Sequence, residues 1–256
     1  MKLIHGDCIE EMNNLINDGV KVDLILTDLP YGVTDNEWDN ILSFEDMWWC
    51  IKNIKLNKKT PILFFGSQPF TSKLVLSKLD WFRYEWIYQK SCGSNFGVVK
   101  YQPMKEHEEI LVFGEKSPYY YPIKEERKGT GLSRVQYSKV KFGDTVSSNY
   151  GNFKNERCVK EYGDLRYPSS IQFFNNRGKG DRGYHPNQKP IELLEYLIKT
   201  YSNENDIVLD FTMGSGSTGV ACQNTNREFI GIELNEAYFN IAKERCNESE
   251  KQTRLL

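Results

Sequence analysis

The stretch VLDFTMGSGSTGVA (residues 208–221) decides the fold of this chain of 256 residues. It predicts a buried strand that ends at Asp210, then a glycine-rich turn, then the start of a helix. Gly214, Gly216 and Gly219 follow the pattern G-x-G-x-x-G, which lets the backbone approach a bound nucleotide closely. The stretch therefore predicts the cofactor turn of a Rossmann-like α/β fold.

The place of this turn in the chain adds a second constraint. An apolar strand at 229–232 leads to Glu233, whose carboxylate can hold ribose hydroxyls. Only 37 residues follow Gly219, too few to complete a nucleotide-binding sheet. The missing strands must come from the N-terminal region, so we expect a permuted sheet whose two ends lie close together.

The N-terminal half supplies a suitable pattern. Short apolar runs predict strands at 2–5, 22–27, 61–65, 84–89 and 109–113, and helical spacing occurs at 7–15, 44–54 and 70–79. Strands that alternate with helices predict a mostly parallel, doubly wound sheet. Residues 116–183 show no sustained period, and we interpret them as an irregular insertion.

Charge is distributed unevenly along the chain. The formal net charge is −2, yet residues 116–189 carry 15 Lys and Arg against 7 Asp and Glu. This asymmetry favours a basic face for a polyanion on an acidic body. A solvated loop rich in lysine is the alternative that charge alone leaves open.

Composition also limits the class of protein. Six cysteines form no C-x-x-C pair and three histidines form no H-x-x-x-H spacing, so we expect no metal site. No signal peptide and no apolar run of membrane length is visible. A reduced, cytoplasmic location is the simplest interpretation.

A second motif, LILTDLPYG (residues 24–32), follows a predicted buried strand. Asp28 and the carbonyl of Leu29, held by the rigid Pro30, can accept both hydrogens of an exocyclic amine, while Tyr31 can stack on its base. An aromatic amine is a poor nucleophile, and two acceptors can aim its lone pair at a methyl group on a sulfonium. Because ligands bind beyond the carboxyl ends of parallel strands, we expect this motif and the glycine turn to open on one edge. Alone, the motif could be an ordinary turn.

Together the motifs resemble a known family. TDLPYG early in the chain, then HPNQKP, then DFTMGSGSTGVA and GIELNEAYFNIAKER are similar to the β-group DNA amino-methyltransferases. This resemblance implies S-adenosylmethionine as cofactor and double-stranded DNA as partner, with adenine N6 as the usual acceptor. Small phage and prophage enzymes carry a similar DLPYG. One departure is Leu29, which replaces the usual first proline.

The resemblance also implies a division of the chain. Residues 1–115 would carry the catalytic motif and residues 184–256 the cofactor motif, both in one domain. Residues 116–183 would form the target-recognition region. The expected fold is a permuted, Rossmann-like S-adenosylmethionine-dependent methyltransferase fold.

Site residues are carried over position by position. The implied methyl-transfer site comprises Asp28, Leu29, Pro30 and Tyr31. The implied cofactor site comprises Asp7, Cys8, Asp28, Asn187, Lys189, Asp210, Phe211, Gly214, Gly216, Ser217 and Glu233. Within it, Asp7 is expected to accept from the cofactor adenine, and Asn187 and Lys189 to lie near the cofactor carboxylate.

The DNA contacts are predicted from the residues themselves. Trp38 is a candidate wall of the base pocket, and Lys90 is a candidate for its mouth. Basic tracts could hold phosphates through Arg127, Lys128, Arg177 and Lys179. Because an amine stacked in a duplex is out of reach, we expect the target base to flip out.

Other functions stay open at this point. The glycine pattern and Glu233 also fit an NAD-dependent oxidoreductase, although DLPY has no role in hydride transfer. Within methyl transfer, the acceptor could be cytosine N4, RNA or a glutamine amide. A catalytically silent DNA-binding module is a further alternative, and a homodimer is possible.

Overall fold

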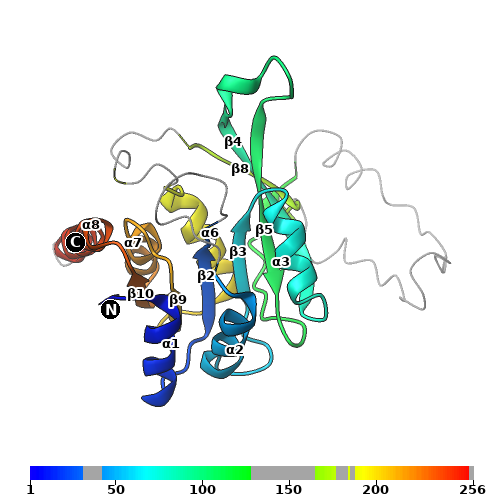
Figure 1. Cartoon of the computed structure of the whole chain (residues 1–256). Helices are drawn as coiled ribbons and strands as arrows, with labels where there is room; N and C mark the ends of the chain where they lie inside the picture. Colours follow the sequence, from blue (N-terminus) through cyan, green and yellow to red (C-terminus); the bar gives the residue numbers. More distant parts are fainter. Residues whose placement is uncertain (31–41, 128–164, 177–183, 185–187, 254–256) are drawn as a thin grey trace. The chain divides into compact units, whose positions relative to one another are not determined.

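The computed structural model of the chain describes residues 1–30, 42–127, 165–176, 184 and 188–253, with side chains up to residue 247 (Figure 1). Met1–Tyr121 and Ser170–Leu256 form one compact unit, and Pro122–Ser169 form a second. In the second unit, β6 (Glu125–Glu126) pairs antiparallel with β7 (Leu165–Arg166).

The first unit is built on an eight-stranded sheet in the order β1-β10-β9-β2-β3-β5-β4-β8. From β1 to β3 all neighbours are parallel, and β5 runs antiparallel to β3 and β4. The strands are β1 (Lys2–His5), β2 (Leu24–Asp28), β3 (Ile62–Gly66), β4 (Phe82–Ser94), β5 (Lys105–Phe113), β8 (Ile171–Phe174), β9 (Ile207–Asp210) and β10 (Glu228–Glu233). The pairing of β1 with β10 confirms the expected permutation, because it places the N-terminal strand beside the last one.

Helices cover both faces of the sheet. One face packs against α1 (Cys8–Asn17), α2 (Phe44–Ile54) and α3 (Phe70–Ser77). The other packs against α6 (Ile191–Tyr201), α7 (Ser217–Asn224) and α8 (Glu236–Thr253). Leu24, Ile25 and Leu26 are all fully buried although neighbours in a strand point to opposite faces. Two covered faces explain why the central strands are continuously apolar.

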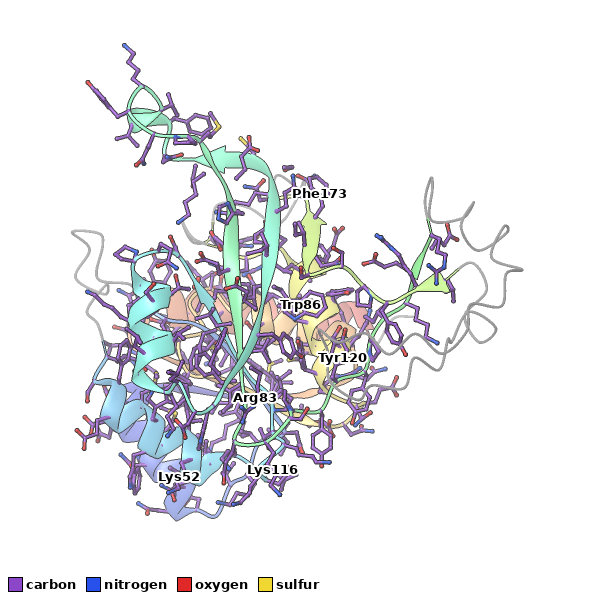
Figure 2. All side chains as sticks on the ribbon, turned by 90° about the vertical axis from the view of Figure 1, so that its right-hand side faces the viewer. Lys52, Arg83, Trp86, Lys116, Tyr120 and Phe173 are labelled. Carbon is purple, nitrogen blue, oxygen red and sulfur yellow. The ribbon has the colours of Figure 1, made fainter. Side chains whose placement is uncertain are left out.

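Two strands are longer than the sequence pattern predicts. The expected strands at 84–89 and 109–113 are the inner parts of β4 and β5, which continue together as a hairpin beyond the helix-covered sheet (Figure 2). The outer part is mainly polar, and its exposed and partly buried residues follow no regular order, so no apolar alternation marks it as a strand. β8, which carries Phe173, lies within the stretch that appeared irregular and pairs with β4.

The described residues carry neither a membrane-spanning helix nor a metal-binding cluster. None of their helices is long and apolar enough to cross a membrane. In the same part of the chain, no three His, Cys, Asp or Glu side chains are grouped to hold a metal ion.

Candidate active site

The two motifs meet at the carboxyl edge of the sheet. β2 ends at Asp28 and its parallel neighbour β9 ends at Asp210. The Thr27 hydroxyl donates to Asp210 Oδ1 at 2.8 Å, and the Thr212 hydroxyl donates to the Asp28 carbonyl at 3.0 Å. These bonds join the strand ends directly, which confirms that the motifs open on one edge.

Asp28 belongs to a cluster of four charged side chains. Lys189 Nζ lies 2.5 Å from Asp28 Oδ2 and 3.2 Å from Glu108 Oε2. Lys90 forms an ion pair with the other oxygen of Glu108. The side chains of Lys189 and Glu108 are only 10% and 16% exposed, so the cluster is shielded from bulk water.

The cluster stays charged despite its burial. Burial by itself raises the pKa of Glu108, but Lys189 and Lys90 lower that pKa to about 2. Burial likewise lowers the pKa of Lys189, but Asp28 and Glu108 raise it well above its ordinary range. Lys189 also lies over the Phe65 ring, 5.0 Å from its centroid. The ion pairs and the contact with the Phe65 ring together hold the Lys189 ammonium group beside Asp28.

Asp210 occupies a different environment one strand away. It is 4% exposed, and Thr218 donates to its Oδ2 at 2.6 Å. Burial raises the pKa of Asp210 to about 6, opposed by hydrogen bonds from Thr218 and Thr27. Asp210 accepts hydrogen bonds from Thr218 of α7, Thr27 of β2 and the backbone of the glycine turn. These bonds fix the conformation of the turn.

The glycine turn is closed by Glu233. Gly214 N donates to Glu233 Oε2 at 2.9 Å, and Asn235 N donates to Oε1 at 2.8 Å. Gly216 has φ 79°, and a Cβ there would lie 2.8 Å from the Cβ of Ala242. A side chain at Gly216 would thus be strained and crowded. Burial raises the pKa of Glu233. A half-buried carboxylate beside a glycine turn fits a cofactor that carries ribose hydroxyls.

The segment that follows β1 reaches the same edge. Gly6 N donates to the Glu233 carbonyl at 3.0 Å. Asp7 Oδ1 accepts from Ile9 N and Glu10 N and so caps α1. Cys8 is buried, and burial raises its thiol pKa to about 12. The structure thus brings the predicted adenine-reading segment beside Glu233.

The remaining predicted cofactor residues are part of the packing. Phe211 is buried and meets Phe64 edge-on at 6.5 Å. The Ser217 hydroxyl accepts from Arg245 at 3.1 Å. Their contact with a cofactor stays a prediction.

The other candidates lie in different parts of the structure. Leu29 and Pro30 directly follow Asp28, and Leu29 is 4% exposed. Arg127 belongs to the second unit, just after β6. Lys90, predicted at the mouth of the base pocket, is paired with Glu108 and 11% exposed. Six predicted residues lie outside the described part of the chain: Tyr31, Trp38, Lys128, Arg177, Lys179 and Asn187.

Sequence reasoning missed Glu108. It lies in β5 between His107 and Glu109, in a run that resembles an exposed strand edge. Glu108 lies near the end of β2 because β5 pairs antiparallel with β3, the neighbour of β2. The acidic pair Glu108–Glu109 before the apolar run ILVF was the available signal.

Comparisons with known proteins identify the family of this chain. A family model described as DNA methylase matches residues 22–244. The Type II methyltransferase M.HpaI of Haemophilus parainfluenzae is 31% identical over 261 residues, which cover 96% of this chain and 74% of that protein. The DNA adenine methyltransferase YhdJ of Escherichia coli (strain K12) is 27% identical over 268 residues, 96% of this chain and 82% of that protein.

A solved structure gives the same result for the fold. The crystal structure of the M1.HpyAVI–SAM complex matches with a TM-score of 0.67 at 24% identity, covering 96% of this chain and 98% of that chain. The chain belongs to the DNA methylase family. It is a DNA methyltransferase with a permuted Rossmann-like fold, and S-adenosylmethionine is its cofactor. The oxidoreductase alternative is thereby excluded.

Proposed function

We propose that this enzyme methylates the N6 amine of adenine at a specific site in double-stranded DNA. One observation carries the proposal: at the end of β2 the Asp28 carboxylate is bound by Lys189, and the Asp28 main-chain carbonyl accepts a hydrogen bond from Thr212 of the glycine turn. A hydrogen-bond acceptor for the target amine and a cofactor turn are thus neighbours on one sheet edge. This arrangement suits direct transfer of a methyl group to an amine.

S-adenosylmethionine supplies a methyl group on a cationic sulfur, and transfer breaks the carbon–sulfur bond as the amine nitrogen bonds to that carbon. Asp28 and the Leu29 carbonyl accept the two amine hydrogens and direct the lone pair along the line of attack. The nitrogen gains positive charge during transfer, and the Asp28 carboxylate stabilises that charge. The product nitrogen then loses one proton to return to a neutral amine.

Lys189 and Glu108 act here as positioning residues. Lys189 fixes the carboxylate of Asp28, and Glu108 neutralises Lys189 so that the site gains no net positive charge beside a cationic sulfur. Lys90 in turn neutralises Glu108. This assignment differs from the cofactor-carboxylate role that the resemblance implies for Lys189, and cofactor affinity of a Lys189→Met variant separates the two.

Adenine is favoured over cytosine as the target. Asp stands at position 28, whereas enzymes that methylate cytosine N4 more often carry Ser there. YhdJ, a relative matched over 82% of its length, is named a DNA adenine methyltransferase. Cytosine N4 stays the alternative, because one family model serves both reactions.

Target recognition is proposed for residues 116–183, where the basic residues concentrate. If about six phosphates are neutralised, the logarithm of affinity falls with that of salt with a slope of roughly −5. Replacing Arg127, Lys128, Arg177 and Lys179 by Ala should weaken DNA binding and flatten this slope, with cofactor binding intact. An unchanged slope would show that these four residues do not bind DNA phosphates and that the DNA-binding surface lies elsewhere.

The function is tested by expressing the enzyme in a host that lacks DNA methylation and reading the genome by single-molecule sequencing. We expect N6-methyladenine at one short sequence motif. N4-methylcytosine would establish the alternative, and no modified base would contradict both. Double-stranded substrate, a homodimer, a cytoplasmic location and the likeness to phage enzymes stay proposals.

A further inference from the structure

The hairpin of β4 and β5 projects from the edge that carries Asp28. In the sheet, Asp28 aligns with Phe65, and Phe65 aligns with Ile110 of β5. All residues of β5 before Ile110, beginning at Lys105, therefore lie beyond the level of the catalytic carboxylate. At about 3.3 Å per residue, the strands extend roughly 15 Å past it before the tip begins. Figures 1 and 2 show this projection clearly.

The tip of this hairpin, residues 95–104, has a defined structure. Asn95 adopts a left-handed conformation with φ 67°, and its side chain accepts from Lys105 N at 2.8 Å and donates to Pro103 O at 3.3 Å. A short 3-10 helix, Phe96–Val98, follows, and Tyr101 N donates to the Val98 carbonyl at 2.9 Å. The tip is closed by its own hydrogen bonds.

This ordered tip presents apolar side chains to solvent. Its large exposed residues are Phe96 (58%), Val98 (41%), Val99 (43%), Tyr101 (88%) and Met104 (40%). Such a group of apolar side chains on a protein surface marks an interaction site. Residues 91–105 also contain two lysines and no acidic residue, so the tip favours a negatively charged partner.

We propose that the tip is a wedge that enters duplex DNA beside the target base as that base swings out toward Asp28. This inference rests on the proposed function, because only a target that leaves a duplex needs a wedge. Flipping leaves a gap in the base stack, and apolar side chains such as Phe or Met can enter between base steps. Tyr101 and Phe96 offer rings that can stack on the bases beside the gap.

DNA fits this surface better than a second copy of the chain. The tip lies beyond the catalytic edge, where a flipped base must leave its duplex. Lys100 stands next to Tyr101, which places a phosphate-binding charge beside the ring most exposed at the tip. A contact between two copies would instead place two basic tips against each other.

The test compares Phe96→Ala/Tyr101→Ala with wild type on two duplexes. In the first, the target adenine is paired; in the second, it faces an abasic position, so that less energy is needed to flip it. We expect kcat/KM to fall at least about tenfold on the paired duplex and to recover most of that loss on the unpaired one. S-adenosylmethionine affinity stays unchanged, because the tip lies away from the glycine turn. Leu76→Ala is the matched control, since Leu76 on α3 is 73% exposed and should affect neither substrate.

Three results would overturn the wedge: full activity of the double variant on paired DNA, equal loss on both duplexes, or conversion of a wild-type dimer into a monomer in light scattering. The last would assign the tip to a second copy. Failure of the proposed function is recognised separately, since wild-type enzyme would then methylate no adenine in either duplex.

Discussion

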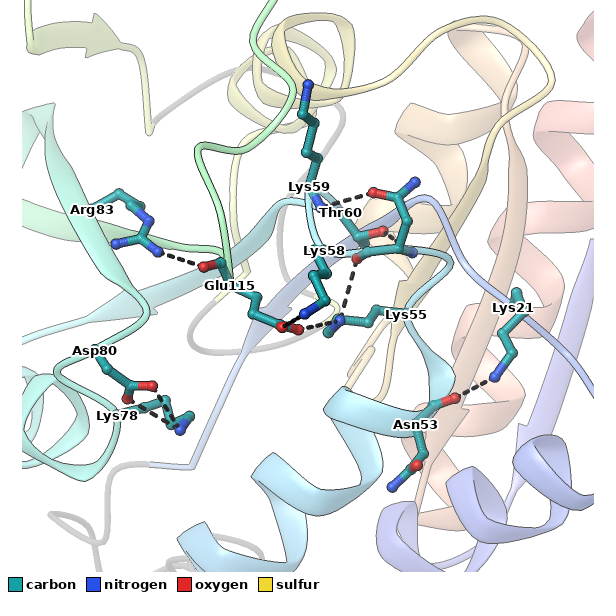
Figure 3. Close-up of polar contacts among 11 residues, drawn as sticks. Lys21, Asn53, Lys55, Lys58, Lys59, Thr60, Lys78, Asp80, Arg83 and Glu115 are labelled. Atoms are coloured by element: carbon teal, nitrogen blue, oxygen red, sulfur yellow. Dashed lines mark hydrogen bonds and ion pairs between the residues drawn. The ribbon is translucent and has the colours of Figure 1, made fainter.

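Two lysine–carboxylate clusters lie at opposite edges of the same sheet, and they differ in what they hold. At the amino edge, Glu115 forms ion pairs with Lys55 at 2.9 Å and with Lys58 at 2.7 Å (Figure 3). Those lysines hold the pKa of Glu115 at about 2. At the carboxyl edge, Lys189 joins Asp28 and Glu108. Both clusters use the same ionic chemistry.

The difference is in their connections. Around Glu115, both lysines come from one turn after α2, and Arg83 donates to the Glu115 carbonyl at 2.9 Å, so the cluster closes a loop. The other cluster draws on β2, β4, β5 and the segment before α6. It includes Asp28, which we propose as the residue that binds the target amine. If that proposal holds, position at the carboxyl edge, and not the ion pair itself, separates a functional cluster from a structural one.

The strongest way to break this comparison is Asp28→Ala. We expect turnover to fall by at least about a thousandfold, because the amine loses its charged acceptor in the transition state. Calorimetry with S-adenosylmethionine should show an affinity within about threefold of wild type, since the glycine turn is intact. Turnover at the wild-type rate would remove Asp28 from the chemistry.

Glu108→Gln and Glu115→Gln form a matched pair that sharpens the comparison. In Glu108→Gln, Lys189 keeps only Asp28 as a charged partner and competes more strongly with the amine, so we expect kcat to fall about tenfold to a hundredfold. KM for DNA should change little. Glu115→Gln should lower the melting temperature and leave kcat unchanged. Equal effects of the two variants on kcat would show that both clusters are structural.

The pH profile of Glu108→Gln gives a second measurement. Burial lowers the pKa of Lys189, and two carboxylates reverse that shift. With one carboxylate removed, the pKa of Lys189 falls, and Lys189 loses its proton at a lower pH than in wild type. We expect kcat of the variant to begin to change at a lower pH than kcat of wild type. Parallel profiles would contradict the positioning role.

Glu233→Ala tests the cofactor side and should have a smaller effect. We expect S-adenosylmethionine affinity to fall about tenfold, because charge-assisted hydrogen bonds to the ribose are lost together with the bond that closes the turn at Gly214. Saturating cofactor should restore most of kcat. Unchanged affinity in calorimetry would exclude Glu233 from the ribose site.

The last prediction concerns the stability of the fold, where we expect the ionisation of Asp210 to act without a large effect on turnover. Its folded pKa is about 6, above its ordinary value of 3.8, so its stabilising contribution is complete below that value and disappears as pH rises through about 6. Relative to Asp210→Asn, wild type should lose at most about 3 kcal/mol of unfolding free energy between pH 4 and 7. Urea unfolding measures this difference, and a constant difference would contradict the shift.

The cofactor side could be predicted from the sequence because it is local. The strand, the glycine turn and the carboxylate from Asp210 to Glu233 lie within 24 residues, and positive φ at Gly214 and Gly216 demands glycine. The permutation followed from counting the strands that remain after the turn. DLPY marked Asp28 because it directly follows a buried strand.

Tertiary structure alone decided the rest. Lys189 pairs with Asp28 although 161 residues separate the two in sequence. Glu108, 80 residues from Asp28, reaches the same Lys189 because β5 enters the sheet antiparallel beside β3. The outer hairpin of β4 and β5 carries no burial period, since its two strands pair with each other and its residues are mainly polar. The amino-acid sequence by itself determined the fold class, the glycine turn and the position of Asp28, the proposed amine-binding residue, at the end of a buried strand, because these depend on backbone conformation and apolar periodicity. The partners of that residue, and the projection of the tip beyond it, depend on strand order and register, which neighbouring residues in the chain do not specify.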